Sequence, residues 1–285
     1  MKKLLITGAS GFLGSRILQY YEKEYEICTP SHQEMDITDE FAVLKTFKRE
    51  QPDLVIHCAA ISDTGKCERE PEISWKINVD GCKYIAKAAK KIGAKCLICS
   101  SDQVYFGSDN RNPHTEDEEL LPANVYGREK LQAEIDSLTV NPDCVLLRLA
   151  WMYDIESNNP NEHGDFIRTL FDKLDTSEPL SYSIHDVRGI TDVNEVLRNL
   201  QKSFALPGGV YNFGSPNEYT TYQTVATLFR DMGLDVARLQ KNEVSFRDKP
   251  RNLAMSQKKL NKYGIEFSST AEALRRNLRE HFHLN

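Results

Sequence analysis

Short apolar segments alternate with amphipathic ones through the first half of the chain. Apolar runs that favour buried strands lie near residues 3–7, 25–29, 53–58, 95–101 and 144–149. Between them, apolar positions spaced three and four apart predict helices near 12–22, 39–50, 72–91 and 124–138. Alternation of strand and helix is typical of a parallel sheet with helices on both faces. The pattern therefore predicts an α/β fold with a doubly wound parallel sheet.

Beyond residue 150 the periodicity loosens. It predicts a helix near 165–173, a strand near 181–185, and a last sheet strand at Tyr211–Gly214. Asp192 and Glu195 have the spacing of a capping box, which predicts a helix from there to about 203. We expect residues 220–285 to be mostly helical. These elements indicate a first domain over 1–150, to which segments near 187–215 return, and a smaller lobe formed by 151–186 and 216–285.

A glycine-rich turn, Thr7-Gly-Ala-Ser-Gly-Phe-Leu-Gly14, joins the first strand to the first helix. Gly8, Gly11 and Gly14 fall at the tight turn, at the close backbone approach and in the first helical turn. This arrangement lets a pyrophosphate sit on the helix N-terminus. The spacing is GxxGxxG, which departs from the usual GxGxxG. The turn predicts a dinucleotide site, and a glycine-rich turn without a ligand is the alternative.

Small or polar residues follow three of the predicted strands at their carboxyl ends. They are Gly8, the pair Ala59 and Ala60, and the pair Ser100 and Ser101. Ligands of doubly wound sheets bind at this edge. We therefore expect one crevice to collect these residues.

Tyr126 and Lys130 form a YxxxK pair within a predicted helix. Residues four apart share one helix face, so the ammonium can lower the pKa of a phenol that ordinarily titrates near about 10. A tyrosine with such a neighbour can act as an acid or base near neutral pH. An isolated YxxxK is more often a half-buried tyrosine and a solvated lysine on an amphipathic helix. The upstream glycine turn is what favours the catalytic interpretation.

Composition narrows the possible partners. The chain has 285 residues and a net charge of −6 with no basic block, which argues against nucleic-acid or anionic-membrane partners. No apolar run is long enough to span a bilayer, so we expect a cytoplasmic protein. Most of the seven cysteines lie in apolar segments and are expected to be buried thiols. No His, Cys or carboxylate group has metal-ligand spacing.

Several segments in this order resemble the extended short-chain dehydrogenase/reductases, and among them the dTDP-4-dehydrorhamnose reductase (RmlD-like) branch. They are the GxxGxxG turn, Met35–Asp39, His57–Ala60, Ile77–Gly81, Ser100–Tyr105, Pro122–Lys130, Arg148–Tyr153 and Lys249–Ser256. The resemblance covers most of the chain. It implies a Rossmann-type NAD(P)-binding fold, an oxidoreductase that acts on a nucleotide sugar, and a possible homodimer.

The resemblance also implies roles for individual residues. Tyr126 would be the proton donor, Lys130 its electrostatic partner and a ribose ligand, and Ser101 a hydrogen-bond donor to the substrate oxygen. Together with Tyr126 and Lys130, the cofactor contacts would be Gly8, Ser10, Gly11, Phe12, Leu13, Gly14, Asp36, Ile37, Ala59 and Ala60. The substrate contacts would be Ser101, Asp102, Gln103, Trp151, Arg188 and Arg251. Asn78 would brace the helix behind the site.

The end of the second strand bears on the choice of cofactor. NAD-specific sites place an acid there to hold the ribose 2′-hydroxyl. Here the strand is followed by Thr29-Pro-Ser31-His32, and no acid occurs before Glu34. Hydroxyls and a histidine tolerate a 2′-phosphate, so NADP(H) is slightly favoured over NAD(H).

The segment His185–Thr191 departs from the branch, because it lacks the Gln and the Pro of the usual DQxGxPT and carries Arg188 instead. Three classes of function therefore stay open. The first is an NAD(P)H-dependent reductase of a nucleotide-linked 4-keto-6-deoxy sugar. The second is an epimerase or dehydratase of the same superfamily, of which dehydration is disfavoured because Gln103 cannot serve as a general acid. The third is a non-catalytic NADP-binding subunit like the β subunit of methionine adenosyltransferase.

Overall fold

The computed structural model describes residues 1–156, 165–174, 176 and 179–281. The chain divides into two compact units, each made of separated segments. The first unit comprises Met1–Val104, Leu120–Arg148 and Leu197–Tyr211. The second unit comprises Tyr105–Glu119, Leu149–Val196 and Asn212–Asn285.

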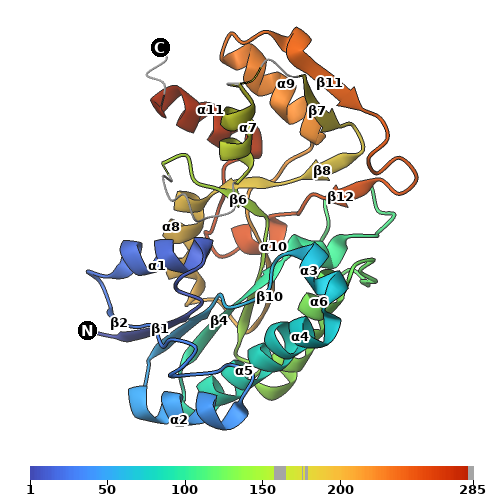
Figure 1. The fold of residues 1–285 in the computed structure, drawn as a ribbon. Helices are drawn as coiled ribbons and strands as arrows, with labels where there is room; N and C mark the ends of the chain where they lie inside the picture. Colours follow the sequence, from blue (N-terminus) through green and yellow to red (C-terminus); the bar gives the residue numbers. More distant parts are fainter. Residues whose placement is uncertain (157–164, 175, 177–178, 282–285) are drawn as a thin grey trace. The chain divides into compact units, whose positions relative to one another are not determined.

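A six-stranded sheet forms the centre of the first unit (Figure 1). Its order is β10-β5-β4-β3-β1-β2, and β1 pairs in parallel with β2 and β3, as β3 does with β4. The chain thus winds outward in both directions from the β1–β3 pair, as predicted for a doubly wound sheet. The strands are β1 (Lys3–Thr7), β2 (Glu26–Cys28), β3 (Leu54–His57), β4 (Lys95–Ser101), β5 (Val145–Leu149) and β10 (Gly209–Phe213).

Helices cover this sheet, and Figure 1 shows α1 on the opposite side from α2 and α5. The predicted helix over 72–91 is three consecutive pieces, since a π-helix at Lys76–Asp80 separates α4 from α5. Helix α3 was not predicted from the sequence. The helices are α1 (Phe12–Tyr21), α2 (Glu40–Glu50), α3 (Thr64–Arg69), α4 (Pro71–Trp75), α5 (Gly81–Ile92) and α6 (Val125–Val140). Helix α8 (Val193–Ser203) contributes its second half to this unit.

Burial of apolar side chains explains why the sheet occupies the centre. All four residues of β3 and all five of β5 are buried, as expected for parallel strands covered on both faces. Residues of α2 and α5, including Phe47 and Ile85, pack with Leu5, Val55 and Ile98 of the sheet in one apolar cluster. This continuous core fixes the strand ends that carry the candidate site.

The second unit has its own apolar core and three two-stranded parallel sheets. Tyr153, Phe166, Phe229 and Leu274 belong to that core and are at most 3% exposed. The sheets pair β11 with β7, β12 with β8, and β6 with β9. The strands are β6 (Trp151–Tyr153), β7 (Leu180–Ser183), β8 (Asp186–Arg188), β9 (Ile190–Asp192), β11 (Leu239–Asn242) and β12 (Arg251–Leu253). The helices are α7 (Phe166–Leu174), α9 (Thr221–Asp231), α10 (Lys258–Asn261) and α11 (Thr270–His281).

Two expectations for this region differ from the structure. The expected mostly helical segment 220–285 also contains two strands. β11 and β12 lie between α9 and α10 and pair with earlier strands. The carboxylate of Glu195 does not close a capping box with Asp192. It accepts bonds from Ser268 and Arg276, which are distant in the sequence. A capping box is formed instead at Thr220 and Gln223, at the start of α9.

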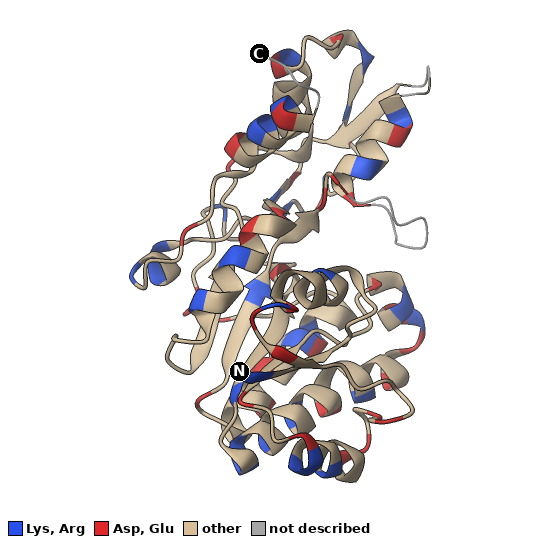
Figure 2. Cartoon of the chain, turned by 90° about the vertical axis from the view of Figure 1, so that its left-hand side faces the viewer, with Lys and Arg blue, Asp and Glu red and all other residues tan. Residues whose placement is uncertain are grey.

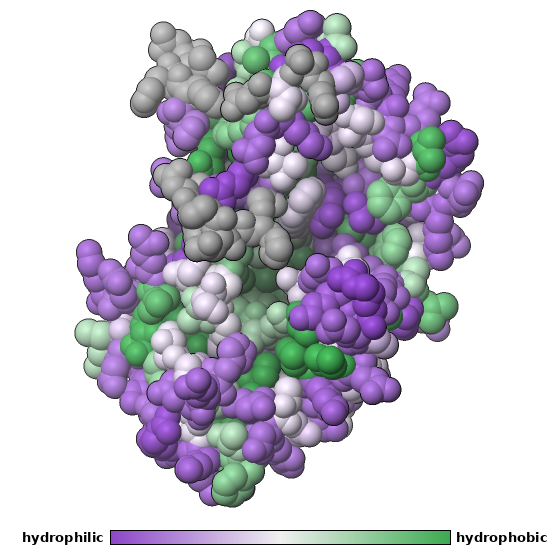
Figure 3. Space-filling model, in the orientation of Figure 1, coloured by the Kyte–Doolittle hydropathy of each residue, from purple (hydrophilic) through white to green (hydrophobic). Residues whose placement is uncertain are grey.

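The two signs of charge are interspersed over the helices and loops (Figure 2). Hydrophilic side chains dominate the visible surface, and hydrophobic ones gather in separate patches (Figure 3). Phe41, Leu121 and Val244, which are among the most exposed large apolar side chains, lie on separate segments. None of the helices in the described ranges is long and apolar enough to cross a lipid bilayer.

Candidate functional site

The glycine turn between β1 and α1 forms an open helix N-terminus. Gly8 has a φ of 71°, and its carbonyl accepts a 3.0 Å bond from the amide of Gly11. Helix α1 begins at Phe12, and Gly11 caps it without a side-chain bond. A Cβ on Gly14 would lie 2.1 Å from the Gly8 oxygen, whereas one on Gly11 would meet that oxygen at 3.4 Å. Gly14 therefore serves packing, and Gly11 faces open space where a ligand phosphate can approach.

A pocket of about 610 Å³ opens in front of this turn. It brings together seven of the twelve predicted cofactor residues, and its lining does not include the other five, which are Phe12, Leu13, Gly14, Tyr126 and Lys130. The wall also includes residues that were not predicted as cofactor contacts, because they come from loops and helices after β2 and β3. The full lining is Gly8, Ser10, Gly11, His32, Asp36, Ile37, Thr38, Cys58, Ala59, Ala60, Ile61, Lys66, Ile73, Lys76 and Ile77.

Phe12, Leu13 and Gly14 lie on the first turns of α1. The guanidinium of Arg16 stands over the Phe12 ring, with its carbon 3.9 Å from the ring centroid, and Leu13 is buried. Asp36 makes a tight turn in which its carboxylate accepts 2.8 Å bonds from the amide and hydroxyl of Thr38. These bonds lower the pKa of Asp36, so it is a carboxylate at neutral pH.

Tyr126, Lys130 and Ser101 come together at the end of β4. Helix α6 begins after Asn124, whose side chain caps the amide of Gly127 at 2.7 Å. A Cβ on Gly127 would lie 2.4 Å from the carbonyl oxygen of Gln103, so only glycine permits this approach of helix and strand end. The glycine after the tyrosine is a positioning signal that the sequence analysis missed.

The three side chains are nearly buried, with 7% of Tyr126, 9% of Ser101 and 3% of Lys130 exposed. The ammonium of Lys130 donates a 2.9 Å bond to the carbonyl of Cys99 and lies 5.7 Å from the centroid of the Tyr126 ring. The Ser101 side chain lies close enough to Tyr126 to lower the pKa of the phenol, and its hydroxyl donates a 3.2 Å bond to the carboxylate of Asp102. The predicted catalytic set is therefore one cluster, close to the backbone of the neighbouring strand.

The net shift of the Tyr126 pKa is opposite to the one expected from the sequence. Burial raises the pKa of Tyr126, and this outweighs the lowering by the Lys130 charge and the nearby Ser101 side chain. Burial alone would lower the pKa of Lys130, but its interactions with Tyr126 and nearby thiols raise it. At neutral pH the cluster therefore holds a protonated phenol beside an ammonium, which is the form that a proton donor requires.

Two buried carboxylates on α6 hold the surroundings of this cluster. Glu129 accepts bonds from Ser74 and Asn78, at 2.5 and 2.7 Å. Asn78 in turn clamps the backbone of Ile61 through both its amide oxygen and nitrogen. The predicted brace at Asn78 thus links α6 to the loop that lines the pocket.

The second carboxylate, Glu134, lies one turn after Lys130. It pairs with Arg148 of β5 at 2.7 Å and accepts a 2.5 Å bond from Ser100. The ion pair with Arg148 ties α6 to β5, and the bond from Ser100 ties it to β4, both behind the cluster.

The residues predicted to contact the substrate divide between the two units. Ser101, Asp102 and Gln103 lie in the first unit, where the Gln103 side chain accepts a 3.0 Å bond from Asn124. In the second unit the guanidinium of Arg188 stacks on Trp151, with its carbon 4.5 Å from the ring centroid.

Arg251 also lies in the second unit and makes a bidentate pair with Asp186, at 2.7 and 2.8 Å. Burial alone would raise the pKa of Asp186, but the hydrogen bonds and charge of Arg251 lower it. Two donors of Arg251 are therefore committed to a buried carboxylate.

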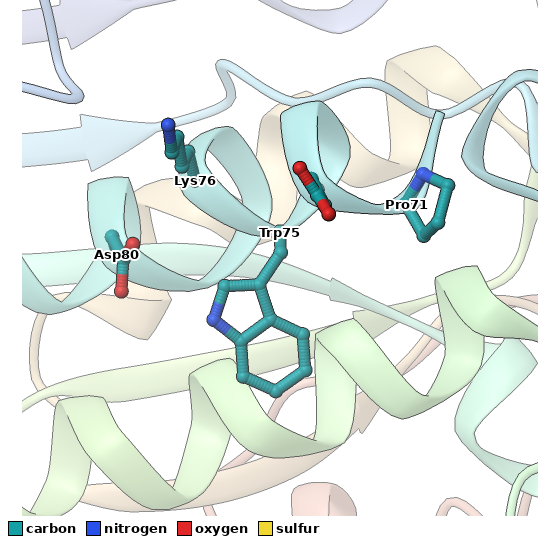
Figure 4. Close-up of a pocket in the computed structure, with 5 residues that line it drawn as sticks. Pro71, Trp75, Lys76 and Asp80 are labelled. Atoms are coloured by element: carbon teal, nitrogen blue, oxygen red, sulfur yellow. The ribbon is translucent and has the colours of Figure 1, made fainter.

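A second hollow in the first unit, of about 430 Å³, is lined by Pro71, Glu72, Trp75, Lys76 and Asp80. Trp75 points from α4 toward α6, and Lys76 and Asp80 lie further along the same helical stretch (Figure 4). None of the predicted catalytic or cofactor residues lines it. Among the described residues, no group of three or more His, Cys, Asp or Glu is arranged to hold a metal ion.

The parallel sheet, the glycine turn and the Ser-Tyr-Lys cluster define a Rossmann-type unit of the short-chain dehydrogenase/reductase kind. Residues 1–282 match the model of the family described as "RmlD substrate binding domain". The chain belongs to that family.

Named relatives extend over most of the chain. It is 28% identical over 285 residues to the spore coat polysaccharide biosynthesis protein SpsK of Bacillus subtilis, covering 98% of both chains. It is 30% identical to a dTDP-4-dehydrorhamnose reductase of Streptomyces griseus, over 83% of this chain and 78% of the relative. The β subunit of methionine adenosyltransferase 2 of Xenopus laevis is 28% identical, over 93% of this chain and 83% of the relative.

The fold agrees with solved structures. The structure of dTDP-4-dehydrorhamnose reductase from Bacillus anthracis in complex with NADP superposes with a TM-score of 0.86, at 24% identity, over 98% of this chain and 100% of that one. The predicted family, the Rossmann fold class and, at the level of the family, the assignment to NAD(P)-dependent oxidoreductases are confirmed.

Proposed function

We propose that this chain is an NAD(P)H-dependent reductase of a nucleotide-linked 4-keto-6-deoxy sugar. The observation that carries the proposal is the buried Ser101–Tyr126–Lys130 cluster in the same unit as the glycine-turn pocket. The reductase relative from Streptomyces griseus supports the substrate class.

The pocket offers backbone donors suited to a dinucleotide. The amides at the start of α1 have no capping side chain at Gly11, and they are suited to a pyrophosphate. We assign Gly8, Ser10 and Gly11 to the pyrophosphate, and Asp36 and Ile37 to the adenine end. When bound, the reduced nicotinamide would supply the hydride.

The chain's own residues would supply the proton and the orientation. Tyr126 would give its phenolic proton to the substrate carbonyl oxygen, and Ser101 would donate a hydrogen bond to that oxygen. The phenolate left behind would be stabilised by the ammonium of Lys130, which the Cys99 carbonyl holds in place. A low-dielectric surrounding strengthens this charge interaction.

We further propose that NADP(H) is preferred over NAD(H). His32, Lys66 and Lys76 place potential cations along the pocket wall. The first acid after β2, Glu34, accepts bonds from the amide and hydroxyl of Ser31, at 2.8 and 2.7 Å, and is not part of the lining. A ribose 2′-phosphate would therefore meet basic side chains, and the carboxylate in the lining, Asp36, is already engaged by the amide and hydroxyl of Thr38.

Incubation with NADPH and a panel of nucleotide-linked keto sugars should show oxidation of the cofactor for the 4-keto-6-deoxy members. Loss of nicotinamide absorbance is the measurement, and the same panel with NADH gives the cofactor preference. If the protein binds NADPH tightly but reduces no member of a broad panel, the reductase proposal is wrong. A regulatory binding role like that of the methionine adenosyltransferase β subunit would then replace it.

Arg188 is proposed to contact the substrate diphosphate. Replacing Arg188 by Ala should raise the Michaelis constant for the sugar nucleotide about tenfold or more, because a hydrogen bond to a charged group contributes about 1.5–3 kcal/mol. The affinity for NADPH should stay unchanged in a fluorescence titration. A change confined to the cofactor affinity would contradict this role.

Arg251→Ala is the comparison variant from the same unit. It leaves the buried Asp186 carboxylate without its bidentate partner, so we expect a loss of about 3 kcal/mol of unfolding free energy. Urea denaturation would measure the loss. A normal stability combined with a raised Michaelis constant would assign Arg251 to the substrate instead.

A further inference from the structure

Two cysteine thiols lie side by side at the wall of the pocket. Cys58 follows β3 directly, and Cys99 lies in β4. Their Sγ atoms are 3.5 Å apart. The parallel register pairs His57 with Ile98, so the next residues along, Cys58 and Cys99, are neighbours on the same face of the sheet.

This thiol pair is in contact with both parts of the candidate site. Cys58 is half-buried and lines the pocket in front of the glycine turn, together with Ala59 and Ala60. The carbonyl of Cys99 accepts the bond that holds the ammonium of Lys130. A covalent change at the two sulfurs would therefore reach the pocket wall and the lysine anchor together.

The geometry and the electrostatics suit oxidation to a disulfide. A disulfide needs its sulfurs about 2.05 Å apart, so the pair must close by about 1.5 Å. The hydrogen bond between the two thiols lowers the pKa of Cys99, and the charge of Lys130 acts in the same direction, against the smaller opposing effect of burial. Thiolate character favours reaction with an oxidant.

We propose that Cys58 and Cys99 are a peroxide-sensitive modification site, that their oxidation to a disulfide disables the pocket, and that a bound dinucleotide shields them. The shielding rests on the proposed cofactor site. The disulfide itself does not, because it depends only on the distance between the sulfurs and on the access that the pocket-lining Cys58 gives to the adjoining Cys99, which is 8% exposed.

The oxidant is hydrogen peroxide, and the reaction balances without another reagent. The Cys99 thiolate attacks one peroxide oxygen, the O–O bond breaks, and the departing hydroxide takes up a proton to leave as water. The sulfenic acid on Cys99 is then attacked by the Cys58 sulfur. The S–S bond forms, the S–O bond breaks, and the hydroxyl leaves as a second water with the Cys58 thiol proton. Two thiols are oxidised and one peroxide is reduced.

Closing the disulfide should lower cofactor affinity and turnover. It draws Cys58 toward β4, which displaces the chain leading into Ala59 and Ala60. It also constrains the Cys99 backbone, whose carbonyl positions Lys130. Reduction with dithiothreitol should restore both properties.

The test treats the full chain with hydrogen peroxide, with and without NADPH, and then maps disulfides by mass spectrometry of peptides prepared without reduction. We expect a Cys58–Cys99 cross-link, the loss of two titratable thiols, and at least tenfold slower cross-linking at saturating NADPH. Cys58→Ser and Cys99→Ser should each abolish the cross-link and the reversible loss of activity relative to their own untreated samples. Cys28→Ser is the matched control, because Cys28 is also half-buried but lies at the end of β2, outside the thiol pair. It should keep the cross-link and the reversible loss of activity.

The other neighbouring thiols give an internal comparison. Cys96 and Cys144 also interact with each other, but they are 1% and 0% exposed within the core. A cross-link there, or no cross-link at all in the wild-type chain, would overturn the proposal. Cross-linking that NADPH does not slow would overturn the shielding. Cross-linking in a protein that binds neither NADPH nor NADH would leave the thiol pair established and would refute the cofactor proposal instead.

Discussion

Replacement of Tyr126 by Phe should reduce turnover of a keto-sugar nucleotide by roughly two to four orders of magnitude, which is the usual effect of losing a positioned acid. The change removes only the phenolic hydroxyl, so the ring packing at the start of α6 stays. The fold and the NADPH affinity should therefore survive. Steady-state kinetics combined with a cofactor titration would measure the two effects separately. Reduction at the parent rate would show that Tyr126 is not the proton donor.

Variants of the neighbouring residues should give distinct patterns. Lys130→Met should damage both turnover and cofactor affinity, because its ammonium is assigned to the phenolate and to the ribose. Ser101→Ala should cost less, about two to three orders of magnitude in turnover at most, as for the loss of one oxyanion-type donor. Because burial raises the pKa of Tyr126, the proton donor is fully present at neutral pH and is lost only as the pH rises through that raised value. The pH profile of the parent should therefore decline on the alkaline side, and Tyr126→Phe should lack this decline.

Replacement of Gly11 by Val should abolish binding of NADPH and NADH without unfolding the sheet. A Cβ at Gly11 meets only the Gly8 oxygen, at 3.4 Å, so the protein itself has room for a Cβ at this position. The backbone of Gly11 is extended, with φ −82° and ψ 173°, which suits a β-branched residue. The added methyl groups would occupy the space in front of the helix N-terminus. Calorimetric titration would measure the loss, and an unchanged affinity in a folded variant would refute the phosphate-site assignment.

Gly14→Ala is the matched control from the same turn. Its Cβ would lie 2.1 Å from the Gly8 oxygen, so the turn must shift or the helix must move. Such overpacking typically costs about 1–3 kcal/mol. We therefore expect Gly14→Ala to lower the melting temperature, whereas Gly11→Val should leave it nearly unchanged. The two variants together separate a binding role from a packing role.

Local sequence was a good guide where a short-range physical requirement fixed the residue. Gly8 adopts a positive φ, and the apolar runs of β1 and β3 are buried as parallel strands require. It was a poor guide where a side chain found a distant partner. Glu195 had the spacing of a capping box, yet its carboxylate accepts hydrogen bonds from Ser268 and Arg276. Such tertiary hydrogen bonds to a charged group outweigh a helix cap, which contributes about 1 kcal/mol.

The sequence by itself determined the doubly wound sheet, the open turn at Gly11 and the shared helix face of Tyr126 and Lys130, because periodicity and glycine spacing encode them directly. Only the tertiary structure decided the burial of the cluster, and with it the raised pKa of Tyr126, since desolvation depends on every segment packed around the phenol. It also decided that Lys66 and Lys76 line the pocket, and that the sulfurs of Cys58 and Cys99 meet. Residues 41 positions apart become neighbours only when β3 and β4 pair, and no local pattern specifies that pairing.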